Sequence, residues 1–281
     1  MSYAADFLKA NDPDRYYSSL VLPEGHRDAI QALYAFSADV AAIPQRVSQP
    51  GPGEIRLQWW ADALQNIGHG EVRQNPLAAE LLEAVARYKL PVGPLLHLIA
   101  ARRFDLYDDP MPDVTTFEGY AGETVSVLFQ LAAMILNDGT PVEAGDAAGH
   151  LGVAHALAGH LSAFGYNAAR ARIFLPWSVF AANGVHEQEL FEARVSEGLL
   201  AALAQLHDLA RDHLAKAGAA VAHLPRHLRP AFATIALLPS RLSALERGQE
   251  SPYAPPGELP DWRKIAALWW WSVRTSVKTR T

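Results

Sequence analysis

Apolar residues recur at helical spacing along most of this chain, and this period constrains the fold more than any other feature. Ile30, Leu33, Tyr34, Val40 and Ile43 fall on roughly one face of a helix. No segment alternates polar and apolar residues over the length that a half-buried strand requires. The sequence therefore predicts an all-α protein.

Proline and glycine divide the helical pattern into segments. Pro23 and Pro44 bound the first long helix, and the loop Pro252–Pro260 separates the last helix from the body. There is no internal repeat and no linker long enough to join two domains, so we expect a single domain, residues 1–281, packed around a central cavity. Beyond the first helix, the expected helices cover residues 52–67, 77–89, 94–106, 115–136, 143–163, 187–217, 226–237, 239–247 and 261–276. The first of these should present Ile55, Trp59, Ala63 and Ile67 on one face.

Composition restricts the class of protein. The chain has 281 residues, of which 50% are hydrophobic and 19% charged, so it can bury a large core. A net charge of −6 gives no basis for nucleic-acid binding, and the absence of cysteine excludes disulfides and thiolate metal sites. The N-terminus does not resemble a signal peptide, and no run of about 18 uninterrupted apolar residues predicts a spanning helix. We therefore expect a cytoplasmic protein.

The segment Tyr34–Arg46 has the frame of an aspartate-rich helix, but it contains only one aspartate, Asp39. An enzyme that binds diphosphates through Mg²⁺ needs several carboxylate oxygens, because Mg²⁺ prefers oxygen ligands in octahedral geometry. Ala41 and Ala42 offer no side-chain ligand, and Gln45 offers no charge. The segment therefore does not predict a metal site.

The flanks of this segment are similar to a known family. Asp14–Pro23 and Arg27–Phe36 precede it, and Gly165–Pro176 ends in Arg-x-Arg-Ile-Phe-Leu-Pro. Together these blocks resemble the squalene/phytoene synthases, the head-to-head isoprenyl diphosphate synthases, over nearly the whole chain. The resemblance implies an isoprenoid-synthase-like helical bundle around a central cavity.

In that family, two aspartate-rich motifs hold Mg²⁺ and the substrate diphosphates. The positions that match the first motif are Ala41, Ala42 and Gln45, and those of the second are Ala163 and Asn167. A phosphate-contacting serine is replaced by Asp14, and the central Tyr-x-Tyr block keeps only Tyr120. The resemblance therefore gives a fold without its catalytic carboxylates, and we expect no catalytic residues, no bound metal and no cofactor.

These departures are similar to a degenerate subfamily, which includes an assembly factor of respiratory complex I and its bacterial relatives. The shared features are the segment Val47–Trp60, the Tyr120-x-x-x-Thr124 block and the Arg170-x-Arg172 block without aspartates. The resemblance implies a synthase fold reused for assembly, with complex I subunits as partners at the inner face of the membrane.

Two other functions stay open at this point. One is an active prenyl transferase of the squalene or phytoene synthase type, which would need Mg²⁺. The other is a module that binds a lipid or an isoprenoid in the central cavity without transforming it. Mg²⁺-dependent binding of farnesyl diphosphate favours the first, and an apolar ligand retained through purification favours the second.

Five side chains are candidates for the mouth of the cavity. Arg170 and Arg172 can bind phosphate through their guanidinium groups without a metal, although both also suit a solvated helix end. Tyr16, Tyr17 and Ser18 open the N-terminal block, where they either line the pocket or pack a helix against the body.

The remaining acidic and histidine clusters do not predict a metal site. The only group of carboxylates is Asp105, Asp108, Asp109 and Asp113. Asp105 matches an inward-facing position in the family, and the other three suit a polar loop between prolines. His223 and His227 have the spacing of a helical metal pair, but a proline lies between them.

The C-terminal helix, 261–276, carries three consecutive tryptophans, Trp269, Trp270 and Trp271. Adjacent residues point about 100° apart on a helix, so the three indoles cannot all face one core. Together with Arg274 and Lys278, they suit a membrane interface or a protein partner. The alternative is a terminal helix that only caps the bundle.

Overall fold

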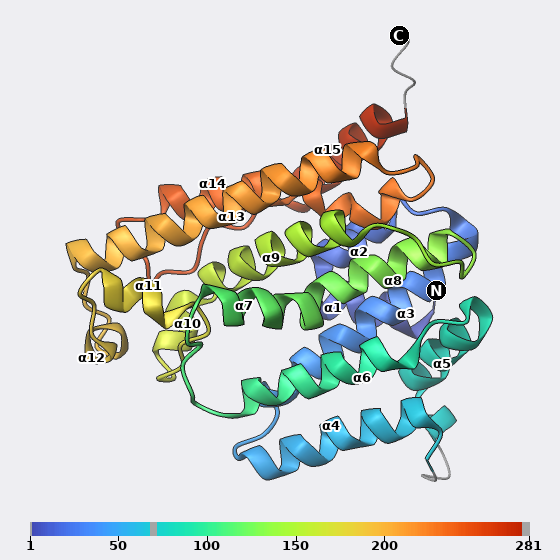
Figure 1. The fold of residues 1–281 in the computed structure, drawn as a ribbon, viewed down its shortest axis with the longest axis horizontal. Helices are drawn as coiled ribbons and strands as arrows, with labels where there is room; N and C mark the ends of the chain where they lie inside the picture. Colours follow the sequence, from blue (N-terminus) through green and yellow to red (C-terminus); the bar gives the residue numbers. More distant parts are fainter. Residues whose placement is uncertain (1, 68–71, 277–281) are drawn as a thin grey trace.

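The computed structural model describes residues 2–67 and 72–276, and across these residues the chain is helical with no strands (Figure 1). The all-α prediction is therefore confirmed. The first half contains α1 Tyr3–Asn11, α2 Pro13–Ser19, α3 Glu24–Ala41, η1 Ile43–Gln45, α4 Pro50–Gln65, η2 Val72–Gln74, α5 Pro76–Tyr88, α6 Val92–Ala101, η3 Arg102–Leu106 and α7 Val114–Ala121.

The second half begins with a short π-helical segment, η4, which joins α7 to α8. It contains η4 Gly122–Ser126, α8 Val127–Leu136, α9 Gly145–Ser162, α10 Phe164–Ala168, α11 Trp177–Ala182, α12 Glu187–Phe191, α13 Glu197–His223, η5 Arg229–Ala236, α14 Leu238–Arg247 and α15 Asp261–Ser276. Residues 248–260 form an irregular segment between α14 and α15, which we call the strap.

Local capping explains where several helices begin. The Asn75 carboxamide oxygen accepts hydrogen bonds from the first backbone N–H groups of α5, and Asp113 and Ser196 cap α7 and α13 in the same way. The cap at Ser196 begins a new helix and so corrects one prediction. The helix expected over 187–217 is two helices, because Ala193 adopts a left-handed backbone (φ 53°) that a continuous helix excludes.

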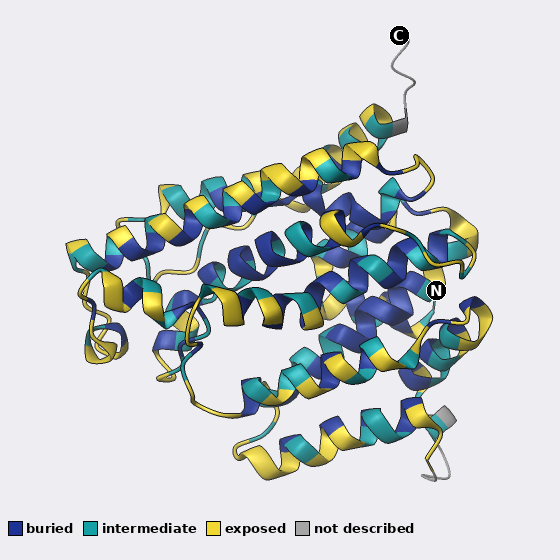
Figure 2. Ribbon diagram, viewed as in Figure 1, coloured by how far each residue is buried: buried dark blue, intermediate teal, exposed yellow. Residues whose placement is uncertain are grey.

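Helix α9 lies at the centre of the bundle. It packs along α13 on one side and against α8, η4 and α14 on others, and most of its residues are buried (Figure 2). Gly152 makes the closest of these approaches possible, because a Cβ there would lie 2.0 Å from the Ser126 Oγ of η4. This close packing holds the π-helical segment against α9, next to the cavity described below.

Helix α4 packs on the bundle with a different face from the expected one. The sequence suggested a face that included Ile55 and Ile67, but both are exposed. The buried stripe is Leu57, Trp60 and Leu64, spaced three and four residues apart. Trp60 decides this orientation, since its indole packs edge-on against Phe36 at a centroid distance of 5.0 Å.

One stretch in the described part of the chain is long and apolar enough to cross a membrane by composition, although the sequence showed no uninterrupted apolar run. It is Val114–Leu136, with a mean hydropathy of 1.3. Buried residues make up 67% of this window, which is the pattern of a core helix.

Candidate ligand-binding cavity

A cavity of about 680 Å³ lies between the C-terminal end of α3, η3, η4, the second half of α9 and the loop after α10. Of the residues singled out by sequence, it is lined by Ala41, Gln45, Asp105, Asp108, Tyr120, Thr124, Ala163, Asn167, Arg170 and Arg172. The chain segments that match the two aspartate-rich motifs therefore meet here. Ala42 and Asp39 are not among the residues that line this cavity.

Asp39, the one carboxylate in the segment Tyr34–Arg46, already has two partners. The Arg46 guanidinium donates to Asp39 Oδ1 at 2.6 Å, and the Trp60 indole N–H donates to Oδ2 at 3.0 Å. Both carboxylate oxygens are thus engaged by groups that fix α4 and η1 to α3. This arrangement stabilises the fold and leaves no free oxygen for a cation.

A buried triad forms one wall of the cavity. The Arg102 Nη1 group donates to Asp105 Oδ2 at 2.9 Å and to the Tyr120 hydroxyl at 2.8 Å, and that hydroxyl donates to Asp105 Oδ1 at 2.6 Å. Burial raises the pKa of Tyr120 well above its usual value. Burial alone would lower the pKa of Arg102, but the facing Tyr120 and Asp105 raise it. The triad therefore holds one compensated charge pair at neutral pH.

The two arginines after α10 differ in their contacts. Arg172 pairs with Asp108, Nε to Oδ1 at 3.1 Å, and donates to the Asp105 backbone carbonyl at 3.2 Å. Arg170 lies over the Tyr166 ring, 3.6 Å from its centroid, and has no acidic partner among the described residues. Asp108 lies in an exposed loop, as the sequence predicted, and the structure also places it at the cavity wall.

Two half-buried histidines, His155 and His160, line the same cavity. Burial lowers the pKa of His155 well below its usual value, and lowers the pKa of His160 to about 4. Both rings are therefore neutral at pH 7. His160 stacks on Phe174, with ring centroids 5.4 Å apart. Because they lie five positions, or about 140°, apart on α9, helical periodicity does not predict that both line one cavity.

The N-terminal block contributes a residue that the sequence analysis did not single out. Arg15 lines the cavity, with its side chain 7% exposed and paired to Asp12 at 3.2 Å. Tyr16, Tyr17 and Ser18 are not part of the lining. The two tyrosine rings pack edge-on at 5.6 Å, and the Ser18 hydroxyl donates to a backbone carbonyl one turn earlier.

The cavity is lined by more positive than negative side chains. Four arginines and two aspartates line it, Arg15, Arg102, Arg170, Arg172, Asp105 and Asp108. Each aspartate is paired with an arginine, and within residues 2–67 and 72–276 no group of three His, Asp or Glu side chains could hold a metal ion. This donor set does not fit Mg²⁺, and the excess of arginine makes the cavity electropositive.

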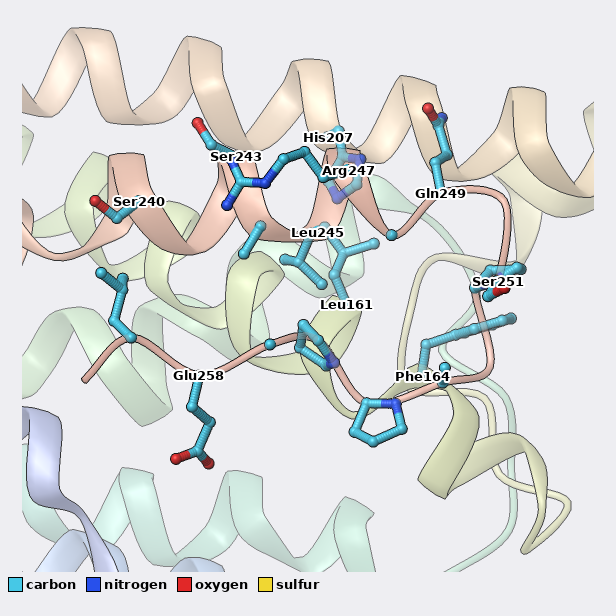
Figure 3. Close-up of a pocket in the computed structure, with 18 of the residues that line it drawn as sticks. Leu161, Phe164, His207, Ser240, Ser243, Leu245, Arg247, Gln249, Ser251 and Glu258 are labelled. Atoms are coloured by element: carbon cyan, nitrogen blue, oxygen red, sulfur yellow. The ribbon is translucent and has the colours of Figure 1, made fainter.

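A second cavity, of about 730 Å³, lies between α13, α14 and the strap (Figure 3). Ser240, Ser243 and Arg247 line it from α14, and Glu258 lies across from them on the strap. None of the residues singled out by sequence lines this cavity. Its walls are largely apolar, and it lacks the paired charges of the central cavity.

Comparison with known proteins places the chain in a family. The squalene/phytoene synthase pattern matches residues 8–266, so the chain belongs to this family. A solved dehydrosqualene synthase with a bound ligand superposes with a TM-score of 0.82 at 19% identity, covering 97% of this chain and 95% of the other. That likeness confirms the fold.

The names of two sequence relatives describe different functions. Complex I assembly factor 6 of Rattus norvegicus is 28% identical over 245 residues, 87% of this chain and 73% of its own length. The 15-cis-phytoene synthase of Synechococcus elongatus is 26% identical over 265 residues, 90% of this chain and 86% of its own. The family thus includes both an assembly factor and an enzyme at similar identity to this chain.

Proposed function

We propose that this chain is a non-catalytic member of the squalene/phytoene synthase family that assists the assembly of respiratory complex I in peripheral contact with the membrane. One observation carries the loss of catalysis. The carboxylates that remain at the central cavity, Asp105 and Asp108, are each paired with an arginine, and Asp39 is held by Arg46 and Trp60.

The physical reason lies in the reaction that the family performs. Ionisation of an allylic diphosphate needs its negative charge neutralised in the transition state, which a bridging metal accomplishes. Ala41 and Asn167 supply no anionic ligand for such a metal. Arginines alone can hold an anion, but without a metal they stabilise a departing diphosphate poorly.

Support for the assembly role comes from the relatives. Complex I assembly factor 6 proteins from several mammals match 87% of this chain at 26–29% identity. The partner would then be a subunit of complex I.

Catalysis is tested directly. Purified protein is incubated with farnesyl or geranylgeranyl diphosphate and Mg²⁺, with an active phytoene synthase as the positive control and heat-treated protein as the blank. We expect the diphosphate to stay unchanged. Product above the blank would reject the proposal in favour of prenyl transfer.

Assembly is tested in the source organism. Deleting the gene should lower the amount of assembled complex I, measured by native electrophoresis and NADH oxidation in membranes, and a plasmid copy should restore it. Affinity purification from membranes in mild detergent then identifies the subunit. Normal complex I in the deletion strain would contradict the role.

The electropositive cavity favours a second candidate function, the binding of a lipid or isoprenoid anion without chemistry. Arg170 is its one cation without an acidic partner in the described part of the chain, and Val125 and Ala156 add apolar wall. Mass spectrometry of organic extracts from purified protein tests this. A retained amphiphile that is lost in Arg170→Ala, but kept in the exposed control Arg56→Ala, supports it.

A further inference from the structure

Helix α15 turns its apolar side toward solvent. Trp262, Trp269 and Trp270 are 65%, 62% and 53% exposed, and Ile265 and Val273 are exposed as well. At 3.6 residues per turn, these five positions fall within an arc of ~140°. An ordinary surface helix shows the opposite arrangement, with its apolar stripe against the core.

The opposite side of α15 is anchored to the bundle. Leu268 is buried with Ala233 and Leu237, and Trp271 packs against the same cluster. Lys264 pairs with Asp14 of α2 at 2.8 Å. Because the inner side already holds the helix in place, the outer apolar stripe is not required for its attachment.

Two arginines flank the exposed stripe. The Arg263 guanidinium lies 5.2 Å from the Trp262 ring centroid, and that of Arg274 lies 4.9 Å from Trp270. Both positions lie on the same edge of the stripe, at about 100° and 120° from Trp262. The stacking keeps each cation beside an indole, at the height of the apolar surface.

The charge of this end of the chain opposes that of the rest. Residues 261–281 contain five cations and a single acid, Asp261, in a chain whose net charge is −6. A surface of exposed indoles with adjacent arginines therefore complements an anionic and apolar partner.

We propose that the outer face of α15, defined by Trp262, Ile265, Trp269, Trp270 and Val273, docks on an anionic lipid surface. Indoles and long basic side chains are the residues that settle at the boundary between headgroups and acyl chains. This inference rests on the proposed membrane contact, and is independent of the assembly role and of the proposed loss of catalysis.

A second copy of the chain fits this face less well. A two-fold dimer through α15 would bring the same positively charged surface of both copies together, which like-charge repulsion disfavours. Figure 1 shows α15 at one edge of the molecule and α4 at the opposite edge, so exposed residues of α4 lie away from the proposed docking face.

Cosedimentation with vesicles tests the proposal on the full chain. Vesicles of phosphatidylcholine alone are compared with vesicles that also contain phosphatidylglycerol, each at low and high salt. We expect binding to the mixed vesicles only, and weaker binding at high salt, because each cation near an anionic surface contributes roughly fivefold in affinity. The double variant Trp269→Ala/Trp270→Ala should bind at least tenfold less tightly, and Arg274→Glu should lose about fivefold or more.

Matched controls come from α4. Ile55 is 72% exposed and Arg56 is exposed without a recorded partner in the described chain, so Ile55→Ala and Arg56→Glu should bind vesicles like the wild type. Thermal unfolding followed by circular dichroism checks that each variant is folded.

Three results would overturn the proposal. Unchanged vesicle binding by the Trp269→Ala/Trp270→Ala variant would show that another surface meets the membrane. A concentration-dependent dimer of the wild type that dissociates in this variant would make the face a self-association interface. A wild type that binds no vesicles would also remove the proposed membrane contact, while the deletion-strain experiment would still decide the assembly role.

Discussion

Replacing Asp105 by asparagine tests whether this carboxylate stabilises the fold or binds a metal. The Asp105 and Arg102 side chains are 8% and 14% exposed, and Tyr120 completes the triad. Asparagine keeps the size of the side chain but removes its charge. The Arg102 guanidinium then stays in the wall of the bundle without a counter-charge.

The expected cost follows from the burial of the pair. Removing one partner of a buried ion pair costs about 3–5 kcal/mol, because the other charge is left uncompensated. We expect about 3 kcal/mol for Asp105→Asn, since Arg102 borders the cavity and water can partly solvate it. Tyr120→Phe removes a hydroxyl that bonds to both charged groups, and should cost about 2 kcal/mol. These losses are large beside a total stability of about 5–15 kcal/mol.

Urea unfolding of the two single variants and of the double variant measures these terms. Because the three groups act as one unit, the double variant should lose less than the two single losses added together. If Asp105 were instead a metal ligand, Mg²⁺ would raise the melting temperature of the wild type and not that of Asp105→Asn. That result, or a loss below about 1 kcal/mol for Asp105→Asn, would refute the reasoning.

Three further outcomes are expected. Gly152→Ala should destabilise the protein by about 1–3 kcal/mol, because the new methyl group meets the Ser126 backbone of η4. Gly149→Ala on the same helix has open space around the new methyl group and should stabilise the protein. Equal effects of the two substitutions in urea unfolding would contradict the close packing at Gly152. The pKa of His160 in the folded protein is lowered to about 4, so between pH 6.5 and 4 the unfolded chain binds a proton that the folded chain does not. The free energy of unfolding should therefore fall by up to about 3 kcal/mol as the pH is lowered through this window. The variant His160→Gln should lack this part of the fall. An identical pH dependence in the variant would reject this. In Ala41→Asp, the melting temperature should not depend on Mg²⁺, because the added carboxylate would pair with an arginine of the electropositive cavity. A rise in the melting temperature with Mg²⁺ would show that one residue can restore a metal site.

The helical pattern predicted most of the fold because its signals are local. The segments 77–89, 115–136, 239–247 and 261–276 each match a helix, or a continuous run of helices, within one or two residues. The pattern could not show the π-helical turn within 115–136, which lies in close contact with Gly152 of α9. The N-terminal helices α1 and α2 were also not predicted.

The candidate site was predicted only in part, since its chemistry depends on contacts between distant segments. The resemblance identified Ala41, Arg170 and Arg172 as residues at the central cavity. It did not identify Arg102, whose role comes from a partner on another helix, or Asp108, whose partner is 64 residues away. Lys278, expected at the membrane or partner surface, lies outside the described residues.

The carboxylates near the cavity and near α15 share one arrangement, in which each is paired with a basic side chain. In this chain Asp39, Asp105 and Asp108 each meet an arginine, and Asp14 meets both Arg241 and Lys264. Pairing of this kind compensates partly buried charges inside the protein without a bound ligand. The same pairing at Asp14 ties α2 to α14 and α15, so the inner side of α15 is fixed by charge while its indoles stay exposed. The absence of carboxylates at Ala41 and Asn167 and the exposed face of α15 are therefore both compatible with the proposed function, in which the synthase fold is kept and contact with a partner takes the place of catalysis.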